Sequence, residues 1–163
     1  MATESGNTPM GTVSFRLGLL GVAQDALYAT RLAELDLKPK HVSLLCVLRL
    51  RGAGSQMELA GLLGVAPSLV VLLADHLEGL GAIQRVRDPA DRRRQSLRLT
   101  EAGLRLLDEA TEAAAKLDQE IAACLPPADQ AALSSALDRL LDLRNGFGRR
   151  GDLQTDHVGF FGP

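Results

Sequence analysis

The sequence predicts a mainly α-helical (α+β) fold: one domain with a helix-turn-helix, a two-stranded β-hairpin and long helices at both ends. Three observations predict it. Apolar residues recur at spacings of three and four along six segments, which is the period of amphipathic helices. A tight break that contains glycine separates the third and fourth of these segments. Two short stretches of strand-like sequence flank a turn sequence, as in a hairpin.

The third and fourth helical segments form the predicted helix-turn-helix. Ser55 is the expected N-cap of the first, residues 56–63, because its hydroxyl can accept from an unpaired backbone N–H. After the break at Gly64-Val65, Pro67 begins the second segment, residues 67–79. Proline lacks a backbone N–H, but the first turn of a helix leaves its N–H groups without intrahelical partners in any case. In such a motif the second helix lies in the major groove of DNA. Its core-facing stripe comprises Val70, Leu73, Leu77 and Leu80.

A basic hairpin follows. Residues 83–87 and 95–99 flank Asp88-Pro89-Ala90-Asp91, which places aspartate and proline where a type I turn prefers them. Six of the chain's 18 Lys and Arg fall within residues 85–98, in a chain of net charge −2. A local excess of positive charge on such a chain is a footprint for phosphate. The alternative is a solvated charge run at a hairpin tip.

This arrangement resembles the multiple-antibiotic-resistance regulator (MarR) family of winged helix-turn-helix transcription factors. Asp91-Arg92-Arg93 matches the family's Asp-x-Arg wing motif, and Leu99-Thr100-Glu101-Ala102-Gly103 matches its Leu-Thr-x-x-Gly motif. The resemblance covers residues 15–145 in element order and is specific over about 55–103. It implies that the hairpin is a wing, and that Arg93, held by Asp91, enters a minor groove. A planar guanidinium suits a narrow, negative groove.

The second helix of the motif departs from the family on its DNA-facing side, where relatives more often carry Ser, Thr and Arg. Leu69, Val71 and Leu72 can contact thymine methyl groups but cannot make bidentate hydrogen bonds to bases. Recognition then depends more on Ser68, on His76, on backbone amides and on the wing. The alternative for Leu69 and Leu72 is that they pack against protein.

The wing arginines other than Arg93 suit phosphate contacts, which position a protein without reading sequence. Together with the helix and the start of the motif they complete the candidate DNA-binding set. The set comprises Ser55, Gln56, Pro67, Ser68, Leu69, Val71, Leu72, His76, Arg85, Arg87, Asp91, Arg92, Arg93 and Arg94.

The helices at the two ends carry more apolar surface than one small core covers, which predicts a two-fold partner. In the resembled family these first and last elements form the dimer interface. We expect a flexible arm at 1–11, a single domain at 12–145 and a C-terminal tail at 146–163. Within the domain, the DNA-binding lobe spans about 38–100 and the dimerisation helices span about 13–36 and 101–145.

The family resemblance also raises two sensing roles. Members often hold small aromatic or phenolic effectors between the dimer helices and the DNA-binding lobe, and Arg16, Tyr28 and His41 are the polar groups suited to such a cleft. The alternative for Tyr28 is a core residue with a satisfied hydroxyl. Redox sensing is disfavoured, because Cys46 and Cys124 sit in apolar periodic runs where a buried thiol is inert.

Other function classes find little support. The longest uncharged run, residues 59–74, is too short to cross a bilayer and contains glycine and proline. No signal-peptide pattern is present, so we expect a cytoplasmic protein. No catalytic grouping or phosphate-binding glycine loop is readable, and the histidines lack metal-ligand spacing. We therefore expect no enzyme activity, no metal and no cofactor.

The leading hypothesis is a DNA-binding transcriptional regulator, a ligand-responsive repressor that binds a pseudo-palindromic operator as a homodimer. The alternative is a winged-helix module for protein contact, with weak or no sequence-specific DNA binding, in which the apolar helix face meets a partner protein.

Overall fold

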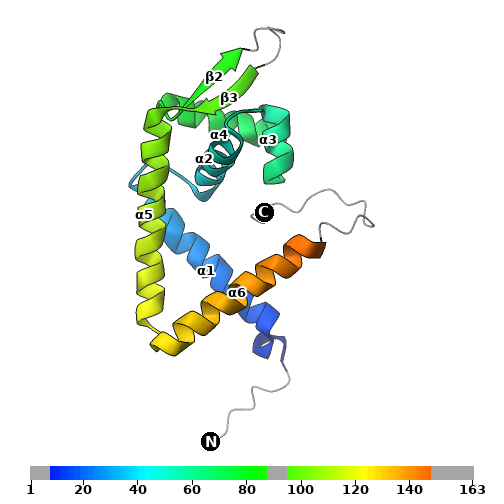
Figure 1. The fold of residues 1–163 in the computed structure, drawn as a ribbon, viewed down its shortest axis with the longest axis vertical. Helices are drawn as coiled ribbons and strands as arrows, with labels where there is room; N and C mark the ends of the chain where they lie inside the picture. The colour runs from blue at the N-terminus through cyan, green and yellow to red at the C-terminus, as the bar shows by residue number, and fades with distance from the viewer. Residues whose placement is uncertain (1–7, 88–94, 148–163) are drawn as a thin grey trace, which may run out of the picture.

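The computed structural model describes residues 8–87 and 95–147, with side chains as far as residue 142. The predicted winged helix-turn-helix is confirmed (Figure 1): a lobe holds the helix-turn-helix and the sheet, and α5 leads away from it to the start of α6. In chain order the elements are η1 (Pro9–Gly11), α1 (Val13–Ala33), α2 (Pro39–Arg51), β1 (Gly54–Ser55), α3 (Gln56–Leu63), α4 (Pro67–Gly79), β2 (Ile83–Arg87), β3 (Gln95–Leu99), α5 (Glu101–Ala123) and α6 (Pro127–Phe147).

The sheet has three antiparallel strands in the order β1-β3-β2, where the sequence predicts two. The hairpin register runs from Ile83 opposite Leu99 to Arg87 opposite Gln95. The extra strand, Gly54–Ser55, pairs with the other edge of β3. This strand is not among the two predicted from the sequence. A strand this short has no alternation to detect, and its pairing depends on a segment distant in the sequence.

The core lies inside the lobe and is largely leucine, with α2, α3, α4 and the sheet around it and with α1 and α5 closing it. The predicted stripe of α4 is confirmed for Val70, Leu73 and Leu77, which are buried. Leu80 is the exception, because α4 ends at Gly79 and Leu80 lies beyond it, partly exposed. The largest fully buried side chains are Leu32, Leu44, Leu45, Leu48, Leu59, Leu77, Leu97 and Val70.

The start of α5 is locked onto the lobe around Gly103. Thr100 is the N-cap of α5: its hydroxyl accepts from the Gly103 N–H at 3.0 Å and donates to the Gly81 carbonyl at 2.6 Å. The Thr100 N–H donates to the Ala82 carbonyl at 3.1 Å. A Cβ on Gly103 would lie 1.9 Å from that same oxygen. The glycine of the Leu-Thr-x-x-Gly motif is thus required by a close backbone approach.

Further contacts fasten α5 along its length. The Tyr28 hydroxyl of α1 donates to the Ala110 carbonyl at 3.2 Å. Ion pairs join Arg31 of α1 to Glu120 at 2.6 Å and Arg49 of α2 to Asp108 at 3.1 Å. These pairs are largely exposed, so each contributes little to stability, and the apolar packing beside Tyr28 matters more. α5 therefore links the lobe to α1.

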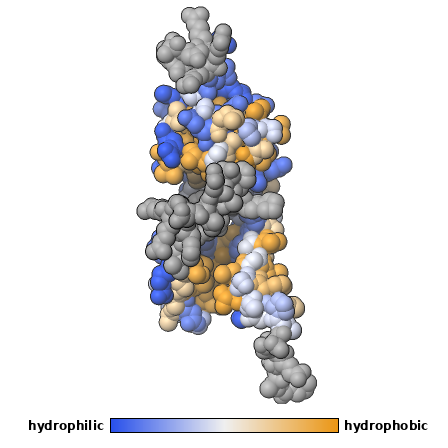
Figure 2. Space-filling view, turned by 90° about the vertical axis from the view of Figure 1, so that its right-hand side faces the viewer, coloured by the Kyte–Doolittle hydropathy of each residue, from blue (hydrophilic) through white to orange (hydrophobic). Residues whose placement is uncertain are grey.

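The helices at the far end leave many large apolar side chains uncovered, and Figure 2 shows hydrophobic residues gathered over the half of the molecule away from the lobe. Within α1 only Leu32 is buried. None of the described helices is by itself long and apolar enough to cross a bilayer; α3 and α4 meet that criterion only as a pair, across a 109° bend. The exposed set on α1 and α6 is Val13, Phe15, Leu17, Leu19, Leu20, Val22, Leu27, Leu133, Leu137, Leu140 and Leu141.

The expectation that both cysteines are buried is wrong. Cys46 and Cys124 are free and exposed. Apolar residues do recur with the helical period in these segments, but each cysteine lies at the edge of the apolar stripe, where it is exposed to solvent. Neighbouring groups still desolvate Cys46 enough to raise the pKa of its thiol, which disfavours the reactive thiolate.

Candidate nucleic-acid interface

The helix-turn-helix is built by three local devices that its sequence supplies. The Ser55 hydroxyl accepts from the Glu58 N–H at 3.3 Å, and a Glu58 carboxylate oxygen accepts from the Ser55 N–H at 2.8 Å, which makes a capping box. Gly64 takes the left-handed conformation (φ 63°) that ends α3. Pro67 occupies the first turn of α4. The predicted cap, break and helix start are all confirmed.

The first two turns of α4 present an outward face made of Ser68, Val71 and Leu72. All three are exposed, and Leu72 has 65% of its surface accessible. Pro67 is exposed at the start of the same helix, and Gln56 is partly exposed at the start of α3. Leu69 differs, because it is half-buried and packs against the core. The alternative stated for Leu69, packing against protein, is thus the one that the structure shows. An aliphatic face suits contact with thymine methyl groups.

His76 does not lie on the outward face, and its placement there is a correction. Seven residues separate it from Leu69, so the two share one flank of α4 and both face toward α2. The His76 ring stacks on His41, with ring centres 4.4 Å apart and planes 8° from parallel. Its Nε2 lies 2.6 Å from the Asp36 carbonyl oxygen and 3.6 Å from the Asp36 carboxylate. The ring fastens α4 to the turn after α1.

The three predicted effector residues are not brought together. His41 is buried and its Nδ1 accepts from the Lys38 N–H at 3.0 Å, so it caps α2. Desolvation, then the nearby His76 and Lys38 charges, lower the pKa of His41 to about 4. The Tyr28 hydroxyl is bonded to α5, which is the alternative stated for it. Arg16 donates to the Gly11 carbonyl on exposed helix surface, and twelve residues of α1, about 18 Å, separate it from Tyr28.

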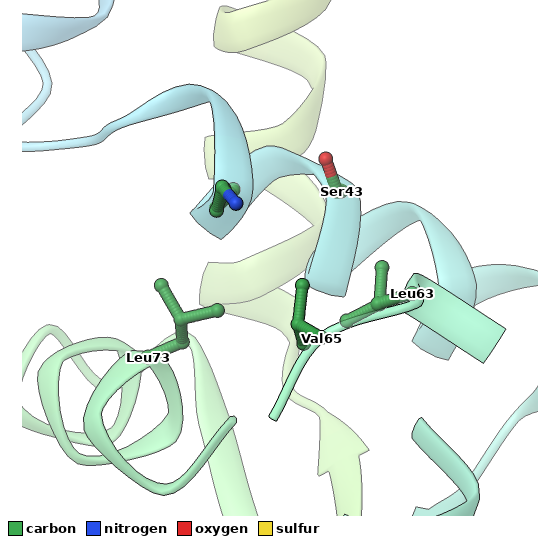
Figure 3. Close-up of a pocket in the computed structure, with 5 residues that line it drawn as sticks. Ser43, Leu63, Val65 and Leu73 are labelled. Carbon is green, nitrogen blue, oxygen red and sulfur yellow. The ribbon is translucent and has the colours of Figure 1, made fainter. Parts of the chain in front are cut away.

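Two hollows in the described part of the chain also lie away from these residues. The first, of about 10 Å³, sits between α2 and the helix-turn-helix, and Ser43, Leu63, Val65 and Leu73 surround it (Figure 3). It is apolar and has room for no more than about one water molecule. The second, of about 470 Å³, is an open hollow beside β1 and α3, lined by Arg51, Ala53, Gly54, Glu58, Leu59, Gly61 and Leu62.

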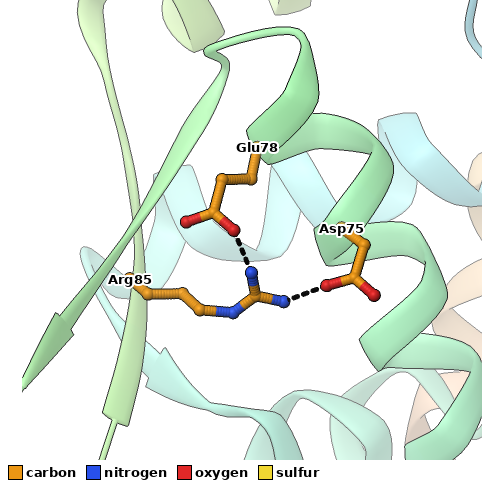
Figure 4. A network of polar contacts seen from close by, with 3 residues as sticks. All are labelled: Asp75, Glu78 and Arg85. Carbon is orange, nitrogen blue, oxygen red and sulfur yellow. Dashed lines mark hydrogen bonds and ion pairs between the residues drawn. The ribbon is translucent and has the colours of Figure 1, made fainter.

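The wing strands carry three described arginines. Arg87 and Arg98 are exposed. Arg85, predicted as a phosphate contact, is only 23% exposed and turns inward to bind two carboxylates of α4, Asp75 and Glu78 (Figure 4). The hydrogen bond to Asp75 is the main cause that raises the pKa of Arg85. The wing-tip residues Asp91, Arg92, Arg93 and Arg94 lie outside the described residues, so their predicted roles stay predictions.

Sequence reasoning missed Asp75 and Glu78, although a signal for them exists. Ile83 and Arg85 are two residues apart on β2 and therefore share a sheet face, and Ile83 belongs to the core. An arginine on the sheet face that packs against the core is partly buried, and buried charged side chains are almost always paired with groups of opposite charge. Asp75 and Glu78, three residues apart, meet that need on one side of α4.

The lobe is similar in sequence to parts of known transcriptional regulators. Residues 37–94 match the MarR family model. A protein of Thauera aromatica, whose description proposes it as a transcriptional regulatory protein for the hcr operon, is 36% identical over 86 residues. The HTH-type transcriptional repressor NicR of Pseudomonas putida is 30% identical over 98 residues. These matches cover 53% and 60% of this chain, and 52% and 62% of the relatives.

Solved structures share the fold over more of the chain. Wild-type MarR of E. coli superposes with a TM-score of 0.73 and 23% identity, over 80% of this chain and 96% of that one. A mutant of the same protein with operator DNA gives 0.62 and 23% identity, over 79% and 93%. BpsR of Bordetella bronchiseptica, whose DNA binding is regulated by 6-hydroxynicotinic acid, gives 0.65 and 23% identity, over 85% and 99%.

Proposed function

We propose that this chain is a DNA-binding transcriptional regulator of the MarR family, because its residues 37–94 match the model of that family. It acts in the cytoplasm as a homodimeric repressor on a pseudo-palindromic operator, responds to a small aromatic or phenolic ligand, and has no catalytic role. One observation carries the proposal: the outward face of α4 and the wing strands belong to one lobe, with the wing joined directly to α4.

The DNA contacts divide between helix and wing. Ser68 can donate to or accept from a base edge, and Val71 and Leu72 suit thymine methyl groups in a major groove. Arg87 and the wing-tip arginines Arg92 and Arg94 then bind phosphates, which fixes the orientation of the helix. Arg93, held by Asp91, enters the minor groove that flanks the site.

The proposed homodimer uses the exposed apolar side chains of α1 and α6. A monomer rarely leaves a contiguous apolar surface of this kind in water, whereas a two-fold interface covers the same surface on both copies. With one lobe at each end of the dimer, two α4 helices enter successive major grooves about 34 Å apart. A ligand near α1 or α5 that alters this spacing changes operator affinity.

Named relatives support the finer parts of the proposal. The repressor name of NicR supports repression, and the E. coli MarR complex with operator DNA supports the binding mode. The regulation of BpsR by 6-hydroxynicotinic acid supports an aromatic effector that bears a hydroxyl. Because the sequence matches span roughly half to three fifths of the two relatives, their activities are carried over only as proposals.

Selection of bound sequences from a random pool of DNA duplexes tests the proposal. The expected result is enrichment of an inverted repeat with half-sites about one helical turn apart, bound by two chains per duplex. Absence of any enriched sequence would contradict it. The second candidate, a protein-contact module, rests on the 65% exposure of Leu72 in an aliphatic helix face; it predicts no enriched duplex.

A further inference from the structure

We propose that Arg85 is a positioning residue that sets the wing against α4, and that it makes no contact with DNA phosphates. The inference rests on the proposed DNA-binding function and deepens it. Three features of the described residues carry it: the direction of the side chain, the local charge balance, and the place of its partners on α4.

The direction follows from the strand register. Arg85 lies directly opposite Leu97, and side chains of directly opposed residues in an antiparallel pair point to the same face of the sheet. Leu97 is 1% exposed and belongs to the core. The Arg85 side chain therefore starts out toward the protein interior. Its guanidinium ends between the Asp75 and Glu78 carboxylates, with one terminal nitrogen on each (Figure 4).

The charge balance disfavours a phosphate at this place. One guanidinium and two carboxylates leave the cluster with a net charge of −1. A phosphate that approached Arg85 would meet the two carboxylates as well, and like charges repel. The guanidinium also has both of its terminal nitrogens engaged already. Arg87 and Arg98 on the same strands are exposed and serve phosphates better.

The place of the partners explains why the bridge matters for recognition. Each residue advances about 100° around a helix axis, so Val71, Asp75 and Glu78 fall on one flank of α4, and Val71 belongs to the outward face. The bridge thus ties the strand that carries the wing to the flank of the helix that reads bases.

Arginine is required at this position, because only its planar fork reaches two carboxylates at once. Lysine keeps the positive charge but offers a single ammonium. A bridge and a phosphate contact therefore respond differently to Arg85→Lys: the bridge is impaired, whereas a phosphate contact is largely retained.

The test measures affinity for the selected operator and for a scrambled duplex, each over a range of salt, for wild type, Arg85→Gln, Arg85→Lys and Asp75→Asn/Glu78→Gln. We expect Arg85→Gln to lower operator affinity roughly tenfold, with little change for the scrambled duplex and an unchanged salt slope. Arg85→Lys should show a similar, smaller loss. Arg85→Gln added to the carboxylate double variant should lower operator affinity no further.

A phosphate contact gives the opposite pattern. Arg85→Gln would then weaken both duplexes alike and lower the salt slope by about one, Arg85→Lys would bind like wild type, and the carboxylate double variant would bind more tightly. Unchanged affinity of Arg85→Gln would equally overturn the inference. If Arg85→Gln unfolds, Arg85→Lys decides between the two patterns. Wild type that binds no duplex contradicts the proposed function itself, which separates the two failures.

Discussion

Replacement of Gly103 by alanine tests the seat of α5 on the DNA-binding lobe. The added Cβ would lie 1.9 Å from the Ala82 oxygen and 2.9 Å from both the Ala82 carbonyl carbon and a Leu99 methyl group. Ordinary contacts between carbon and oxygen are about 3.3 Å or longer. The first turn of α5 must therefore move away by more than about 1 Å, because the Ala82 oxygen belongs to the backbone and cannot turn aside as a flexible side chain can.

The free-energy cost combines three contributions. Overpacking costs about 1–3 kcal/mol. Loss of the Thr100 N–H bond to the buried Ala82 carbonyl, 3.1 Å in the native protein, costs a further ~1–3 kcal/mol. Alanine returns about 1 kcal/mol through its better helix propensity. These contributions sum to a loss of about 1–5 kcal/mol in the free energy of unfolding, with roughly 2–4 kcal/mol at the centre of that range.

Thermal and urea unfolding at one fixed protein concentration measure this loss, since the stability of a dimer depends on concentration. A decrease of roughly 5–15 °C in Tm is expected for a chain of this length. Gly61→Ala is the matched control: Gly61 lies within α3, its added Cβ meets nothing within 4 Å, and the variant should be as stable as wild type or slightly more so. Equal stability of the Gly103 and Gly61 variants would refute the argument.

Three further predictions follow from single sites. Ser55→Ala removes one half of the capping box and should cost about 1 kcal/mol of unfolding free energy, while Met57→Ala on the exposed side of the same helix should cost far less. The pKa of His41 in the folded protein, about 4, lies below its ordinary value of 6.5, so the unfolded chain binds the proton first as the pH falls. The free energy of unfolding should therefore be constant above pH 6.5 and decrease by at most about 3 kcal/mol between pH 6.5 and 4. His41→Gln should flatten that decline, and an identical decline in both proteins would assign it to other groups. Arg93→Ala should weaken operator binding by about 1–3 kcal/mol, whereas unchanged affinity at moderate salt would remove the wing arginine from the account.

Local features of the fold could be predicted from the sequence, because their causes are local. Ser55, Gly64 and Pro67 act through the backbone of their own turns, and each does what its chemistry predicts. The stripe Val70, Leu73 and Leu77 follows from the helical period alone. The two hairpin strands, Ile83–Arg87 and Gln95–Leu99, have the bounds predicted for them.

Features that depend on a second segment could not be predicted. β1 exists only because β3 offers a free edge, and two residues carry no period. The His41–His76 stack and the Arg85 bridge each join elements whose packing angle the sequence does not reveal. Periodicity predicted His76 on the outer side of α4. The residue lies instead at the side of the helix, next to Leu69, which packs against the core. There the His76 ring stacks on His41 of α2.

The salt dependence of DNA binding is the measurement that tests the central claim most directly. The purified chain and its best selected duplex are titrated at several salt concentrations, and the logarithm of the affinity constant is plotted against the logarithm of salt. A dimer that places several arginines on phosphates should give a steep negative slope, about −0.9 for each phosphate neutralised. A slope near zero, with binding that persists at high salt, would contradict an interface built on contacts between arginines and phosphates.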